Sequence, residues 1–156
     1  MHQTLLTVGA LAIALLLALS SQESIVHMEE RKARSEVETM AGQAALNVLA
    51  HIAAQPFDDA TIAGPVSDAS GLTAPSAFPT GLDYDVADDV DDFHRMATHT
   101  YTAFDGIGLS VDAEVRYVDD ALQPSATPTY QKEVTVTVSH ELLDTDVEVS
   151  RIVSWP

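Results

Sequence analysis

The stretch that decides the fold is residues 5–19, LLTVGALAIALLLAL, which contains no charged side chain and no proline. Extended to residues 4–21, the apolar run reaches about 18 residues, the length at which a membrane-spanning helix becomes the default prediction. The strictly apolar part is also as long as the hydrophobic region of a signal peptide, and Ala18-Leu19-Ser20 fits a small-residue cleavage site. Removal by signal peptidase is therefore the alternative, and the residues that follow favour a helix that stays on the protein.

Those following residues continue a helical pattern. No proline interrupts the chain before Pro56, and apolar side chains recur at spacings of three and four, which predicts one apolar stripe along a helix. A single helix over residues 4–54 is about 75 Å long at 1.5 Å per residue, too long for the small remaining domain to cover. We expect lipid or copies of the same helix to shelter the leading half, and the chain's own domain to shelter the second half. The stripe consists of Ile25, Met28, Ala33, Val37, Met40, Ala41, Ala44, Val48, Leu49 and Ile52.

A connecting region follows the predicted helix. Proline disfavours the α conformation of the residue before it, so the helix is expected to end near Pro56, where Asp58 or Asp59 can cap a short turn. Residues 63–81, AGPVSDASGLTAPSAFPTG, are a loop by composition. A loop of this length is either functional or held down by its neighbours.

Six aspartates crowd residues 83–92, DYDVADDVDD. Calcium and other hard cations take several oxygen ligands, so a bound cation is one interpretation of this cluster. A solvated acidic face is favoured, because an EF-hand would need a glycine at its sharp turn and a closing glutamate. A metal or acid/base role for His94 and His99 with Asp91 is disfavoured, because no nucleophile, oxyanion donor or third ligand accompanies them. The candidate cation ligands are Asp85, Asp88, Asp89, Asp91 and Asp92.

After His99 the periodicity changes from helical to alternating. Apolar residues at every second position predict strands with one buried and one solvated face, and residues 119–128 are rich in turn formers. Three or four antiparallel strands with one apolar face match the one apolar stripe of the helix. The fold class is therefore predicted to be α+β, with the sheet laid across residues 37–52. The predicted strands are residues 100–104, 109–117, 133–139 and 147–155.

The composition excludes several classes of function. With 7 Lys and Arg against 24 Asp and Glu, the formal net charge is -17, which repels nucleic acid. The abundance of aspartate suits a domain bathed in high salt, and an acidic surface in an ordinary medium is the equal alternative. The absence of cysteine removes disulfides, thiolate nucleophiles and zinc–thiolate sites. Since no catalytic set converges in the sequence, we predict that the chain is not an enzyme and has no resident cofactor.

The order of these parts resembles type IV pilins and the pseudopilins of type II secretion. Residues 3–19, QTLLTVGALAIALLLAL, and residues 54–61, AQPFDDAT, are similar to minor pilin-like proteins of Bacteroidota and Rhodothermota type. The resemblance implies a pilin-like fold in which a long N-terminal helix, apolar and then amphipathic, packs on a small C-terminal antiparallel sheet. In that family the helix anchors the subunit in the inner membrane and later forms the filament core. The assembly residues it implies are Leu5, Leu6, Val8, Leu11, Ile13, Leu15, Leu16, Leu17 and Leu19.

The chain departs from this family in two ways. The glutamate that the family carries near the start of its mature helix is missing here, where Thr4 and Thr7 are the polar groups. A basic cluster, Arg31 to Arg34, also follows the apolar run, and the positive-inside tendency would keep such a cluster in the cytoplasm.

We therefore predict a structural subunit of a pilus or pseudopilus-like filament. Its partners would be copies of itself and other pilin-like subunits, and it would lie in the inner membrane before assembly and at the cell surface afterwards. The alternatives are a membrane-anchored extracytoplasmic binding domain that does not polymerise, in a secretion system or a virion, and a secreted enzyme. The predicted parts are residues 1–22, an apolar transmembrane or filament-core helix; 23–55, its amphipathic continuation; 56–96, an acidic connecting region; and 97–156, a sheet domain.

Overall fold

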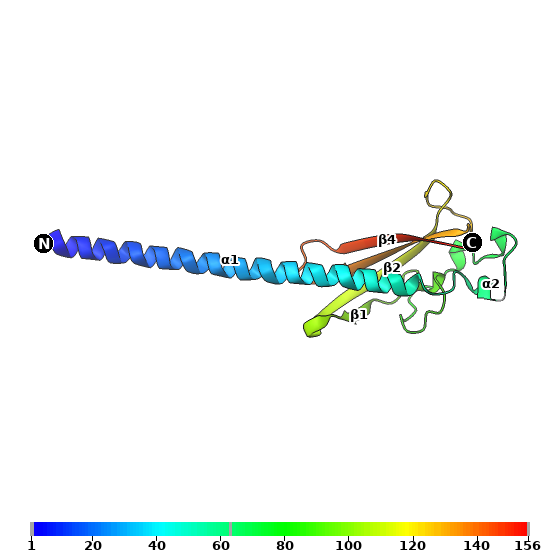
Figure 1. The fold of residues 1–156 in the computed structure, drawn as a ribbon, viewed down its shortest axis with the longest axis horizontal. Coiled ribbons are helices and arrows are strands. Elements are labelled where there is room, and N and C mark those ends of the chain that lie inside the picture. The colour runs from blue at the N-terminus through cyan, green and yellow to red at the C-terminus, as the bar shows by residue number, and fades with distance from the viewer. Residues whose placement is uncertain (1, 63, 156) are drawn as a thin grey trace. The chain divides into compact units, whose positions relative to one another are not determined.

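The structure is a computed structural model with one long helix and one four-stranded antiparallel sheet, which confirms the predicted α+β class (Figure 1). The helix, α1, comprises His2–Ile52. The chain divides into two compact units, Met1–Glu36 and Val37–Pro156, and the division falls within α1. The structure describes the backbone of residues 2–62 and 64–155, and the side chains of residues 11, 27–62, 64–104 and 106–155.

The first unit is helical, and its described side chains face solvent. Residues 27–36 are all exposed, and Lys32 forms an ion pair with Glu36, at 3.7 Å between Nζ and Oε1. Among the described residues, no helical stretch is both long and apolar enough to cross a membrane. Of the predicted assembly residues, Leu11 is 65% exposed, and the side chains of the other eight lie outside the described ones.

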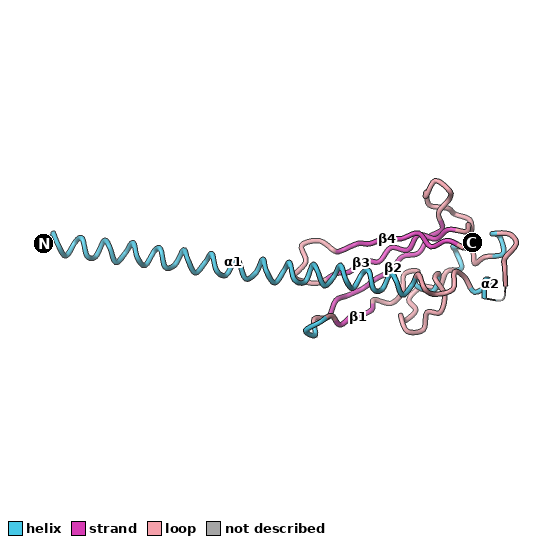
Figure 2. Tube along the Cα trace, viewed as in Figure 1, coloured by secondary structure: helices cyan, strands magenta, loops and turns pink. Residues whose placement is uncertain are grey.

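The sheet is a meander in which each strand pairs with its neighbour in the chain (Figure 2). Its order is β1-β2-β3-β4, and Val111 on β2 lies opposite Val138 on β3. Along β2 and β3 every second side chain is buried, so the predicted alternation is confirmed. The strands are β1 (His99–Thr102), β2 (Gly108–Tyr117), β3 (Gln131–Ser139) and β4 (Val147–Ser154).

In the second unit, the part of α1 from Val37 to Ile52 packs on the apolar face of the sheet, as predicted (Figure 1). Ala41, Ala44 and Ala45 are fully buried, and these small side chains let the helix backbone approach the strands closely. At the edge of the contact the Asn47 amide donates a hydrogen bond to the Tyr101 hydroxyl, at 3.1 Å.

The connecting region covers the same apolar face. A backbone hydrogen bond within it joins Val90 N to Pro56 O at 3.0 Å, and another ties it to β2, from Arg95 N to Ala113 O at 2.9 Å. Leu72 and Phe78, which lie in the predicted loop, are buried in the common core. The described part of residues 63–81 is therefore held down by its neighbours, one of the two options that its length left open. The region contains α2 (Asp59–Ile62), η1 (Ala69–Gly71), η2 (Pro75–Ala77) and η3 (Asp91–Phe93), and η4 (Phe104–Gly106) follows β1.

Candidate functional site

The most unusual group in the core is a lysine. Lys132 lies near the start of β3, in the same alternating register as Val134, Val136 and Val138, so its side chain points into the apolar face. It is fully buried, opposite Tyr117 on β2. A buried lysine is rare unless oxygen atoms compensate its charge, so its surroundings must supply them.

Three oxygen atoms surround the ammonium group of Lys132. Its Nζ donates a hydrogen bond to the backbone carbonyl of Phe57 at 2.5 Å, contacts Oδ1 of Asp91, and lies 3.5 Å from Oδ2 of Asp58. An ammonium group has three N–H donors, so this set of oxygens matches its donor capacity. The three partners all come from the connecting region, which Lys132 therefore ties to β3.

Aromatic rings complete the enclosure. The Lys132 Nζ lies 4.3 Å from the ring centroid of Phe57, 5.1 Å from that of Tyr117 and 5.5 Å from that of Phe78. The faces of aromatic rings attract cations, most strongly where water is excluded. The rings therefore add a favourable electrostatic interaction, and they also keep water away from the ion pairs.

Asp58 is fully buried, and its carboxyl group is held by four donors. Its Oδ2 accepts from Thr73 N at 2.8 Å and from the Tyr117 hydroxyl at 3.3 Å, while Oδ1 accepts from Ala60 N at 3.0 Å and from Thr73 Oγ1 at 3.3 Å. The bond to Ala60 N caps the start of α2, as the sequence predicted. Burial, followed by the charge of Asp58, raises the pKa of Tyr117 and keeps its hydroxyl protonated.

The site holds more carboxyl groups than cations. Asp89 and Asp91 are 3% and 2% exposed, and Asp89 accepts hydrogen bonds from Asp59 N at 2.8 Å and from Asp92 N at 3.1 Å. Burial, and then the charge of Asp91, raises the pKa of Asp89 to about 7. Burial also raises the pKa of Asp91, although Lys132 beside it acts in the opposite direction. One ammonium group thus faces two carboxyl groups directly, and a third lies close by.

The raised pKa of Asp89 predicts that the protein is more stable in mild acid. Between about pH 4 and about pH 7 the folded protein keeps a proton on Asp89 that the unfolded chain has lost, so the free energy of unfolding falls as the pH rises. The slope for this one group is at most about 1.4 kcal/mol per pH unit. Urea unfolding followed at several pH values within this window measures it.

The control for this prediction is a matched pair of variants. Asp89→Asn should reduce the slope, whereas Asp120→Asn, which changes an exposed aspartate, should leave it unchanged. A wild-type protein whose stability rises across the window would contradict the prediction.

The aspartates of the predicted acidic cluster differ in burial: some are exposed and others lie in the core. Asp85 and Asp88 are exposed, as a solvated acidic face requires, and Asp92 is half-buried. The favoured interpretation was wrong for Asp89 and Asp91, because backbone N–H groups and Lys132 draw their carboxyl groups into the core. Among the described residues, no three acidic or histidine side chains come together in an arrangement that would hold a metal ion.

The two histidines of this region lie against aromatic rings. His94 packs edge-on against Phe78, with ring centroids 5.5 Å apart, and its Nδ1 lies 3.4 Å from Val115 N. His99 is on the edge strand β1 and stacks on Tyr84 at 4.4 Å between centroids. Both imidazoles therefore take part in packing around the core.

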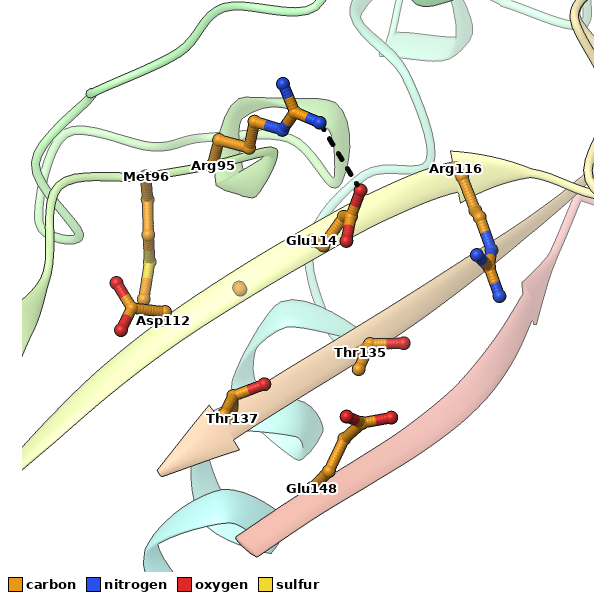
Figure 3. Close-up of a pocket in the computed structure, with 9 residues that line it drawn as sticks. Arg95, Met96, Asp112, Glu114, Arg116, Thr135, Thr137 and Glu148 are labelled. Atoms are coloured by element: carbon orange, nitrogen blue, oxygen red, sulfur yellow. Dashed lines mark ion pairs between the residues drawn. The ribbon is translucent and has the colours of Figure 1, made fainter. Parts of the chain in front are cut away.

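The solvent face of the sheet carries a shallow depression of about 390 Å³, and Figure 3 shows the side chains around it. Its two guanidinium groups are already in ion pairs. Arg95 lies 3.8 Å from Glu114, and Arg116 lies 2.6 Å from Glu133. The lining alternates acidic, basic and hydroxyl groups, which is typical of a solvated sheet face. The residues around it are Arg95, Met96, Asp112, Ala113, Glu114, Arg116, Thr135, Thr137 and Glu148.

Sequence reasoning missed the lysine cluster, although one signal for it was present. Along β3 every second residue is buried, and Lys132 is two residues before Val134 in this alternation. The alternation alone therefore places the lysine side chain on the apolar face. Its partners Asp58 and Asp91 are 74 and 41 residues away in the chain, and no local pattern joins them to β3.

Comparison with protein-family models, with curated proteins and with solved structures gave no significant match.

Proposed function

We propose that this chain is a structural subunit of a pilus or pseudopilus-like extracellular filament, assembled through its N-terminal helix. The observation that carries the proposal is where burial begins along α1. The helix starts at His2, but its described side chains become buried only from Val37 onward. The sequence before Val37 includes the uncharged apolar run of residues 5–19, which needs a cover of its own.

The composition of residues 5–19 indicates which surroundings suit them. Residues 5–19 carry no charge, and apolar surface left in water costs about 25 cal/mol per Å². Lipid satisfies this requirement before assembly, and matching helices of sibling subunits satisfy it afterwards. Small residues such as Ala10, Ala14 and Ala18 allow helices to approach closely. The acidic domain, part of a chain with net charge -17, would face solvent and keep the outside of the filament soluble.

A chain with an apolar helix part for assembly and an acidic domain for solvent agrees with the resemblance to type IV pilins and pseudopilins. An α+β unit that packs on the second part of a helix, and leaves the first part for assembly, is the arrangement which that resemblance implies. We place the subunit in the inner membrane before assembly and at the cell surface afterwards, with copies of itself and other pilin-like subunits as partners.

A pair of leucine variants tests the assembly role. Leu16→Asp puts a charge in the apolar run at a cost of about 2.5–3.5 kcal/mol per subunit in an apolar surrounding, or about a hundredfold in assembly equilibrium. Leu46→Asp makes the same change on the same helix, at a side chain that is 56% exposed in the second unit. We expect electron microscopy of filaments sheared from cells to find the Leu46→Asp chain in the filaments. The Leu16→Asp chain should be absent from them.

The same preparation separates the proposal from its rivals. A chain that stays in the membrane fraction and is absent from sheared filaments would identify an anchored binding domain. A chain recovered in purified virus particles would identify a virion protein. Export of a mature protein that begins near Ser21 would show that the apolar run is a cleaved signal peptide. Any of these three results would overturn the filament role.

A further inference from the structure

The buried lysine has a second chemical possibility besides ion pairing. The Lys132 amine and the Asp91 carboxyl group are in contact, and the two residues are 0% and 2% exposed. In water such a pair stays charged, because hydration stabilises the ammonium and the carboxylate. Inside an apolar enclosure that stabilisation is lost, and moving one proton from nitrogen to oxygen gives a neutral amine beside a neutral acid. These two groups are the reactants of amide formation.

A third group suited to proton transfer is already in place. The Asp58 carboxyl group lies 3.5 Å from Lys132 Nζ, and its four hydrogen bonds fix its orientation. A carboxyl group at this position can take a proton from the attacking nitrogen and return it to the leaving oxygen. The rings of Phe57, Phe78 and Tyr117 exclude water, which would otherwise favour the reverse reaction.

We propose that Lys132 and Asp91 join in an intramolecular amide bond, formed by the folded protein itself with Asp58 as the proton carrier. The assignment of Asp91 as the acylating partner rests on its direct contact with Nζ, whereas both oxygens of Asp58 are engaged by other donors. Burial raises the pKa of Asp91, which favours the neutral acid that the reaction needs. This modification goes beyond the filament role and does not depend on it.

The reaction balances without any further reagent. The neutral Lys132 nitrogen attacks Cγ of the protonated Asp91, an N–C bond forms, and one C–O electron pair moves to the carbonyl oxygen. Asp58 takes a proton from the nitrogen. The intermediate then collapses, the C–OH bond breaks, and the hydroxyl leaves as water with the proton from Asp58. One ammonium and one carboxylate become one amide and one water, and Asp58 is regenerated.

The bond would have a clear structural effect. It would join β3 to η3 across 41 residues of chain, which closes a loop in the way a disulfide does. The chain contains no cysteine, so no disulfide can do so. It would also remove one buried pair of opposite charges from the core, while leaving Asp58 with the donors that already surround it.

Mass spectrometry of the denatured full chain tests the proposal. The wild-type protein should be lighter than its sequence mass by one water. Trypsin should fail to cleave after Lys132, and the digest should contain residues 35–95 linked to residues 117–151 through Asp91 and Lys132. A wild-type chain at its full sequence mass, with normal cleavage after Lys132, would overturn the proposal without reference to any variant.

Variants assign the roles. Lys132→Arg and Asp91→Ala should restore the full mass, and Asp58→Asn should restore it for most of the protein. Lys32→Arg, which changes the other lysine of the chain, should keep the loss of one water. Loss of water that persists in Lys132→Arg would show an origin elsewhere, such as cyclisation at Asp105-Gly106, and would also overturn the proposal. Persistence in Asp91→Ala would overturn the assignment of Asp91.

Discussion

Replacing Lys132 by methionine should lower the free energy of unfolding by about 3–5 kcal/mol. Where Lys132 is an ammonium ion, the substitution leaves buried carboxyl groups without their partner, and where the proposed amide has formed it also removes the cross-link. Methionine fills most of the lysine volume, so the loss comes from electrostatics rather than from a cavity. Asp58 and Asp91 would stay buried without the cation that faces them both. At a slope of about 1–3 kcal/mol per M in urea, the unfolding midpoint should fall by more than about 1 M.

The chain offers its own reporter and control for this experiment. Trp155 is the one tryptophan, and its ring lies 6.4 Å from that of Phe57, which packs on Lys132. Its fluorescence therefore follows the unfolding of the region around the site. Lys32→Met changes the other lysine, an exposed side chain, and should shift stability by no more than about 0.5 kcal/mol. Equal midpoints for the two variants would contradict the structural role of Lys132.

The second large effect is expected at Phe93. This side chain is fully buried in η3, with its ring edge-on to His51 at 6.1 Å between centroids and to Tyr84 at 5.7 Å. It therefore joins the connecting region to the covered part of α1. Phe93→Ala removes these contacts and leaves a cavity, which should cost about 3–5 kcal/mol in urea unfolding.

Phe104 provides the matched control for that substitution. It is 85% exposed in η4, so Phe104→Ala makes the same chemical change without opening a cavity. We expect a change of no more than about 0.5 kcal/mol. A Phe93→Ala protein as stable as the Phe104→Ala protein would mean that the connecting region does not cover the core in the way described.

The elements of the fold were predictable because each leaves a periodic signal. The spacing of Val37, Val48 and Ile52 marks a helical stripe, and the alternation from Leu109 to Tyr117 marks a strand with one buried face. These signals depend only on residues close together in the chain. They also sufficed to predict that the sheet lies across the helix, since each element had a single apolar face to bury.

The candidate site was not predictable in the same way. Asp89 and Asp91 were interpreted as surface charges, because aspartates in a run are usually solvated. Their burial depends on Lys132 and on the N–H groups of Asp59 and Asp92, which only the tertiary fold brings to them. A compensated charge in a core is a property of the whole set of partners, and no member of the set shows it alone.

The order of the elements along the chain has a consequence for biosynthesis. The apolar stripe from Val37 to Ile52 leaves the ribosome before any strand of the sheet that covers it, and the bond between Asn47 and Tyr101 spans 54 residues. At about 5–20 residues per second, that delay lasts about 3–11 s, and β3 follows later still. Throughout this interval the apolar stripe of the nascent helix is exposed, because the strands that cover it have not yet been translated.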